Sequence, residues 1–109
     1  MPLFLRQPRT LFGPIHRAIV NSRPAYLDSL GWVYFRLGRI ESAEKNLREA
    51  HRREPTDPTI AEHLGDLEMK RGNMAGAIQN WEKALELQTE EPDRVKQKLQ
   101  KARAPVSQR

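Results

Sequence analysis

The sequence contains an internal repeat with a period of 34 residues. When residues 24–57 are placed over residues 58–91 without a gap, seven positions are identical, and six of these are proline, glycine, alanine or leucine. These residue types set turns and close helix contacts. A gapless period of this length predicts an architecture in which one unit stacks on the next. The identical pairs are Pro24 and Pro58, Leu30 and Leu64, Gly31 and Gly65, Gly38 and Gly72, Ala43 and Ala77, Asn46 and Asn80, and Ala50 and Ala84.

Each unit has the apolar spacing of two helices joined by a short turn. In the first unit, apolar residues recur at helical spacing over residues 26–37 and again over residues 40–50, with Gly38 between the two runs. We expect Gly38 to adopt the left-handed conformation that commonly ends a helix. The second unit repeats the pattern around Gly72, so four helices are predicted.

Two glycines lie inside the predicted helices. Gly31 and Gly65 occupy interior helical positions, where glycine costs about 1 kcal/mol relative to alanine. Their missing side chains would let the second helix of the same unit approach closely. We expect small residues on the other side of this contact. These are Ala43 and Ala50 in the first unit, and Ala77 and Ala84 in the second.

A fifth helix is predicted from Pro92 onward, with one apolar stripe and a charged outer surface. We expect the stripe to pack against Ile78 and Leu85, as the last turn of a stack of repeats requires. The predicted fold is therefore all-α, with two helix-turn-helix units and a C-terminal capping helix. The stripe consists of Val95, Leu99 and Ala102.

The pattern divides the chain into five parts. These are a basic N-terminal segment at 1–23 (a tail or a short capping helix), repeat units at 24–57 and 58–91, a capping helix at 92–104, and a tail at 105–109. The outward side of the first predicted helix lacks an obvious cover near Tyr26, Val33 and Leu37. Either the segment 14–20 covers it, through Ile15, Ala18 and Ile19, or a second copy of the chain does. The chain is thus predicted to be a monomer or a homodimer.

The net charge of +5 is unevenly distributed along the chain. Residues 1–23 carry +4 and residues 92–109 carry +5, whereas the stretch between them carries −4. Basic ends can attract phosphate backbones or anionic membranes, but solvated charge is the simpler interpretation. With 30% charged residues and no long apolar run, neither a transmembrane helix nor a secretory signal is predicted. A cytoplasmic location is expected.

The first unit resembles the tetratricopeptide repeat, a helix-turn-helix of 34 residues. The resemblance rests on Leu27, Leu30, Gly31, Tyr34, Ala43, Leu47, Ala50 and Pro55. The second unit departs from the family pattern at Glu68, where an aromatic or large aliphatic residue is usual, and at Thr89, where proline is usual. The stretches YLDSLGWVYFRLGR and AEHLGD are similar to the closing repeats of long bacterial tetratricopeptide proteins. The resemblance implies a helical solenoid that binds proteins.

The sequence has no pattern that indicates catalysis or metal binding. His16, His51 and His63 lie in three separate segments without a second histidine at ligand spacing, and the chain has no cysteine. It also has no glycine-rich phosphate loop and no nucleophile elbow. We therefore predict a protein that is not an enzyme and that needs no metal or cofactor.

The resemblance implies that the first helix of each unit lines a concave groove for an extended peptide or a partner helix. Trp32 and Phe35 form one helical turn of aromatic surface there; the alternative is that both pack on the N-terminal segment. The candidate groove residues are Asp28, Ser29, Trp32, Phe35, Arg36, Arg39, Glu62, His63, Asp66, Met69, Lys70 and Asn73.

The residue types in this groove bear on the partner. Family members that hold acidic chaperone tails use lysine and asparagine, whereas the matching positions here are Asp28, Trp32 and His63, so that clamp is absent. An acidic-aromatic groove is expected to accept a basic or apolar protein segment. A basic-ended adaptor for nucleic acid or an anionic membrane is the rival hypothesis, although the acidic middle argues against nucleic acid. A remnant of a longer repeat protein, without a partner of its own, is the third.

Overall fold

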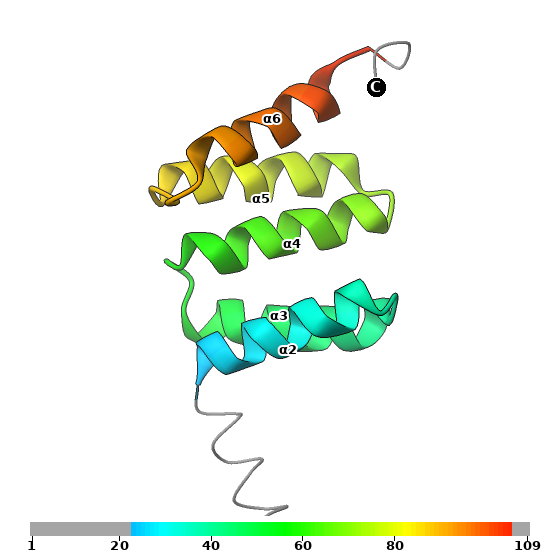
Figure 1. The fold of residues 1–109 in the computed structure, drawn as a ribbon, viewed down its shortest axis with the longest axis vertical. Coiled ribbons are helices and arrows are strands. Elements are labelled where there is room, and N and C mark those ends of the chain that lie inside the picture. The colour runs from blue at the N-terminus through cyan, green and yellow to red at the C-terminus, as the bar shows by residue number, and fades with distance from the viewer. Residues whose placement is uncertain (1–22, 106–109) are drawn as a thin grey trace, which may run out of the picture.

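The computed structural model describes residues 23–105, which form a stack of α-helices (Figure 1). Helix α2 packs mainly on α3, α4 packs on α5, contacts between α3 and α4 join the two pairs, and α6 closes the far end against α5. The predicted all-α fold, with two helix pairs and a closing helix, is confirmed. The helices are α2 (Pro24–Arg36), α3 (Ile40–Arg53), α4 (Pro58–Lys70), α5 (Met74–Glu86) and α6 (Pro92–Arg103).

Equivalent turns end the first helix of each pair. Gly38 has φ of 78° and Gly72 has φ of 83°, in the left-handed region that glycine adopts without strain. The backbone N–H of Arg39 donates to the carbonyl of Tyr34 at 2.9 Å. The same bond recurs one period later, from Asn73 to Glu68, at 2.8 Å. The left-handed helix ends predicted from the two glycines are thus confirmed.

The helical glycines do allow close contact, but not with the expected residues. A Cβ atom on Gly31 would lie 2.7 Å from Leu47 Cγ, and one on Gly65 would lie 2.4 Å from Trp81 Cδ1. The atoms nearest to these two positions thus belong to large side chains and not to the alanines expected there. The missing Cβ atom makes room for a large side chain of the partner helix, which fills the gap more completely than a methyl group would. The four alanines are fully buried elsewhere in α3 and α5.

The apolar core consists of two clusters, with α4 between them. The first cluster joins α2, α3 and α4, and the second joins α4, α5 and α6. The predicted stripe of α6 is buried in the second cluster, and Ile78 and Leu85 are among the partly buried residues that pack against that cluster. The first cluster contains Leu27, Ala43, Leu47, Ala50, Ile60, Leu64 and Leu67. The second contains Ala61, Ala77, Trp81, Ala84, Val95, Leu99 and Ala102.

Glu68, which departs from the family pattern, lies in a polar network. Its side chain is only 8% exposed, yet both carboxylate oxygens accept hydrogen bonds. Arg48 Nη2 donates to Oε1 and Asn73 Nδ2 donates to Oε2, each at 2.6 Å. Because both oxygens have donors, the carboxylate is accommodated where the family usually buries an apolar side chain.

Among residues 23–105, no other helix covers one face of α2. Val33 is 52% exposed and Leu37 is 66% exposed. By contrast Leu67, one period after Val33, is fully buried, because α3 packs on α4. The N-terminal segment proposed to cover α2 lies outside the described residues, so the choice between that segment and a second copy stays a prediction.

Candidate functional site

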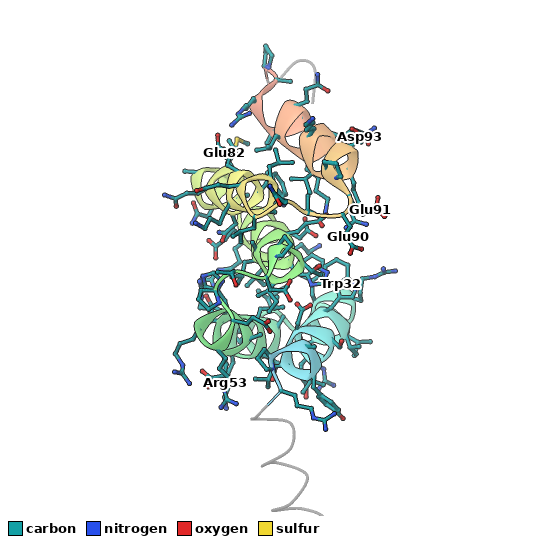
Figure 2. The ribbon with its side chains drawn as sticks, turned by 90° about the vertical axis from the view of Figure 1, so that its left-hand side faces the viewer. Trp32, Arg53, Glu82, Glu90, Glu91 and Asp93 are labelled. Atoms are coloured by element: carbon teal, nitrogen blue, oxygen red, sulfur yellow. The ribbon has the colours of Figure 1, made fainter. Side chains whose placement is uncertain are left out.

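Trp32 is the centre of an aromatic stack that joins the two helix pairs. Its ring stacks on Phe35 of the same helix, with the ring centroids 5.0 Å apart. On the other side it stacks on His63 of α4, with the ring centroids 4.3 Å apart. Figure 2 shows Trp32 on the side of the molecule where α6 begins, opposite Arg53 and Glu82. We call Phe35, Trp32 and His63 the aromatic stack.

A carboxylate holds the histidine of the stack in place. The distance between His63 Nδ1 and Asp28 Oδ1 is 2.7 Å, with the carboxylate oxygen as the acceptor. Asp28 is only 8% exposed. Since Asp28 belongs to α2 and His63 to α4, this hydrogen bond and the ring contact together fix the first helices of the two pairs relative to each other.

An open hollow of about 460 Å³ adjoins the stack at Phe35. Three of its side chains offer apolar surface, and the other three are charged. Because α2, α4, α5 and α6 all contribute to it, the hollow exists only when both pairs and the closing helix are assembled. We call this space the hollow. It is lined by Phe35, Asp66, Met69, Lys70, Trp81 and Lys98.

Glu62, predicted to line the groove, is buried beneath α6. It is 1% exposed, and Arg94 donates to its two oxygens at 2.8 and 2.6 Å. Lys98 Nζ adds a third bond at 2.7 Å. The prediction of a groove-facing carboxylate is therefore wrong for Glu62, because the cations of α6 cover it.

The pKa of Glu62 reflects these contacts. Burial disfavours the charged form and raises the pKa, but the hydrogen bonds from Arg94 and Lys98 outweigh burial and leave the pKa of Glu62 below its usual 4.5. Glu62 is thus an ionised, buried carboxylate at neutral pH. It ties the closing helix to α4.

Asp66 is also engaged within the chain. Its Oδ1 accepts hydrogen bonds from the Trp81 indole at 3.1 Å and from Lys98 at 2.9 Å, and its Oδ2 accepts from Lys98 at 3.0 Å. With Asp28 bound to His63, all three acids expected to make the groove negative have partners in the structure. Glu62 and Asp66 are compensated by cations of α6, whereas the partner of Asp28 is a histidine, which carries charge only when protonated. The expectation of a basic partner therefore has no support from Glu62 and Asp66.

The remaining predicted residues fall into three groups. Met69 and Lys70 line the hollow beside Phe35, whereas Ser29, Arg36 and Arg39 are exposed on α2 or just after it. Asn73 uses its side chain for hydrogen bonds within the chain and not to line the hollow. Its Oδ1 caps α5 by accepting from the Gly76 N–H at 3.0 Å, and its amide nitrogen donates to Glu68.

Arg94, Lys98 and Trp81 also belong to this site, although the sequence did not predict them there. A signal for the first two was present: Glu62 and Asp66 are four residues apart, and so are Arg94 and Lys98. Side chains four apart share a helix face, so two acids on one helix matched two cations on another. The pairing became identifiable only once α6 was known to lie against α4.

We expect Glu62→Gln to lower the free energy of unfolding by about 1–3 kcal/mol at neutral pH. This decrease in the free energy of unfolding is smaller than for a fully buried ion pair, because Arg94 is 52% exposed and can be hydrated. As the folded-state pKa lies below 4.5, the contribution of Glu62 is complete above 4.5 and fades as pH falls through the lowered value. We therefore expect the melting temperature of the variant to fall less steeply than that of the wild type as the pH is lowered from neutral to acidic values.

The matched control is Glu90→Gln, which removes a charge from an exposed glutamate. Its melting curve should parallel that of the wild type at every pH. Arg52 and Arg53 lower the pKa of Glu49 to about 2. Glu49 is unchanged in both variants, so its part in the pH dependence of stability is the same in each. If the Glu62→Gln curve also paralleled the wild type, the carboxylate would not be tied to α6 in solution.

Two further properties concern the described residues. Within residues 23–105, no group of three or more histidine or carboxylate side chains is placed to hold a metal ion. None of the helices over this range is long and apolar enough to cross a bilayer.

Comparison with known proteins agrees with this geometry. Residues 24–67 match the family model described as Tetratricopeptide repeat. A TPR repeat-containing protein of Pseudomonas aeruginosa is 49% identical over 43 residues, which cover 39% of this chain and 7% of that protein. No solved structure gives a significant match. The family match over residues 24–67, the bacterial relative and the stacked helix pairs together support a relationship of this chain to the tetratricopeptide repeat family.

Proposed function

We propose that this chain is a non-catalytic protein-interaction module that binds an apolar segment of a partner, as a peptide or a helix, at the aromatic stack and the hollow. The observation that carries the proposal is the incomplete burial of Phe35 and Met69, which line an open space, and of Trp32, which stacks on Phe35. Large apolar side chains left half-buried around a hollow favour a protein ligand. Tetratricopeptide repeats generally mediate protein–protein interactions, which supports the same conclusion.

The charges of α6 argue against the rival binding of nucleic acid or membrane. Arg94 and Lys98 are paired with Glu62, and Arg103 is paired with Glu82. These cations are therefore compensated within the chain. A phosphate-binding surface needs a row of free cations, and the described part of α6 keeps only Lys96 and Lys101 without an ion pair.

The proposal is tested by binding with the double variant Trp32→Ala, Phe35→Ala. Immobilised wild-type protein should retain its partner from a lysate, and the double variant should lose at least about tenfold in affinity for that partner, because two aromatic anchors are removed. The measurement is affinity capture followed by titration of the identified protein. Retention should persist at high salt, since apolar contacts are not screened.

The matched control is Val33→Ala, an exposed apolar residue of the same helix that lies outside the hollow. It should bind as the wild type does. Thermal melts of every variant separate lost binding from lost folding. Unchanged affinity of a folded double variant would reject the stack as the binding site, and binding that disappears in moderate salt would favour the phosphate-binding rival.

A further inference from the structure

We infer that the partner segment presents a carboxylate beside its apolar anchor, and that Lys70 receives this carboxylate at the rim of the hollow. The inference rests on the proposed function and specifies the chemistry of the ligand. It replaces the basic segment expected from the sequence with an acidic and apolar one.

Two of the three charged residues that line the hollow are paired with each other. Asp66 and Lys98 neutralise each other through two hydrogen bonds at 2.9 and 3.0 Å. Lys98 also donates to Glu62, and an ammonium group has three donors. The Asp66 carboxylate has a further donor in the Trp81 indole. Neither charge is available to a ligand without breaking contacts that hold α6 in place.

Lys70 differs from both of these residues. It is exposed, it lines the hollow beside Phe35 and Met69, and it forms no ion pair with any residue between 23 and 105. Arg36, one period earlier, follows Phe35 directly and is likewise exposed and without an ion pair among those residues. The uncompensated charge at this end of the site is therefore positive.

Exposed acids occur on the same side of the molecule, but they lie away from the hollow. Figure 2 shows Glu90, Glu91 and Asp93 at the start of α6. The only α6 residue that lines the hollow is Lys98, seven residues after Glu91 and thus about 10 Å further along the helix. This separation from Lys98 is about one Debye length at physiological salt, so these acids act only weakly on the hollow. Among the charged residues that line the hollow, Lys70 alone lacks an ion pair with residues 23–105.

The combination of one cation with apolar walls selects a protein segment as the source of the carboxylate. Phe35 and Met69 can hold an apolar side chain, while Lys70 attracts an acidic residue adjacent to it in the same segment. An opposite charge at the rim of an interface mainly sets specificity and association rate. We therefore expect a modest preference in affinity and a clear order among peptides of different charge.

The test uses the full chain and three short fluorescent peptides of one design. The first alternates Glu with Phe and Leu, and the other two replace every Glu by Gln or by Lys. Fluorescence anisotropy of the wild type should rank Glu over Gln over Lys, with about threefold to tenfold between the Glu and Gln peptides. Lys70→Glu should abolish or reverse this order. Lys96→Glu, the same charge change outside the hollow, should preserve it.

The outcomes separate this inference from the proposed function. A wild type that binds the Lys peptide most tightly, or all three peptides equally, overturns the inference and leaves apolar binding at the hollow in place. Failure to bind any of the peptides overturns both. An equal response to Lys70→Glu and Lys96→Glu would attribute the preference to net charge and reject Lys70. Melting curves should be unchanged in both variants because both lysines are exposed.

Discussion

Trp81→Ala is expected to lower the free energy of unfolding by about 3–5 kcal/mol. Trp81 is 4% exposed, and its ring lies directly over Gly65, whose missing Cβ atom leaves the space that the indole fills. Its indole N–H also donates to Asp66. Truncation removes the largest side chain of the second core cluster and opens a cavity beside Gly65.

The measurement is urea denaturation followed by circular dichroism. If the substitution lowers stability alone, the urea concentration at the midpoint of unfolding should fall while the m value changes little. Leu47→Ala is the matched variant, because Leu47 lies over Gly31 in the first unit and is fully buried; a loss of about 2–5 kcal/mol is expected. A loss below about 1 kcal/mol for Trp81→Ala would mean that the indole is not packed as described.

Removal of the closing helix, by ending the chain before Pro92, is the second change with a large expected effect. It deletes Val95 and Leu99, each worth about 1.5–3 kcal/mol when buried, so the melting temperature should fall by about 10 °C or more. The truncation also removes Arg94 and Lys98, the two cations that pair with Glu62. The apolar surface left on α4 and α5 should promote aggregation, because it is an uncapped end of a repeat stack.

The comparison chain for this experiment ends after Pro105 and therefore retains α6. It should melt as the full chain does. Differential scanning calorimetry gives the melting temperatures, and light scattering during heating reports aggregation. A shortened chain that melts with the full chain would show that α6 is not docked on α5 in solution.

Most of the secondary structure was predictable from residues close together in the chain. Proline at the helix starts, glycine at the left-handed turns and apolar residues three and four apart all act within one or two helical turns. The stripe of α6 was identified in the same way and is buried as expected. These signals are local, so they need no knowledge of how the helices are placed in space.

The site was less predictable, because several of its residues are defined by contacts between distant helices. Trp32 and Phe35 were identified as an aromatic surface, but the stacking of Trp32 on His63 depends on the angle between α2 and α4. The glycines indicated a close contact, yet only the packed helices show Leu47 and Trp81 as the partners. A helical pattern predicts which face is buried but not which side chain it meets.

The sequence by itself determined the repeat, its helices, their turns and the closing helix, because each follows from the 34-residue period and from local backbone preferences. Only the tertiary structure decided the electrostatic character of the site. In the sequence, nothing distinguishes Glu62 and Asp66 from acids that are exposed to solvent. Their partners Arg94 and Lys98 lie at least 32 residues away. Because ion pairing depends on distance in space, docking of α6 changes an apparently acidic groove into one whose uncompensated charge at the hollow is the cation of Lys70.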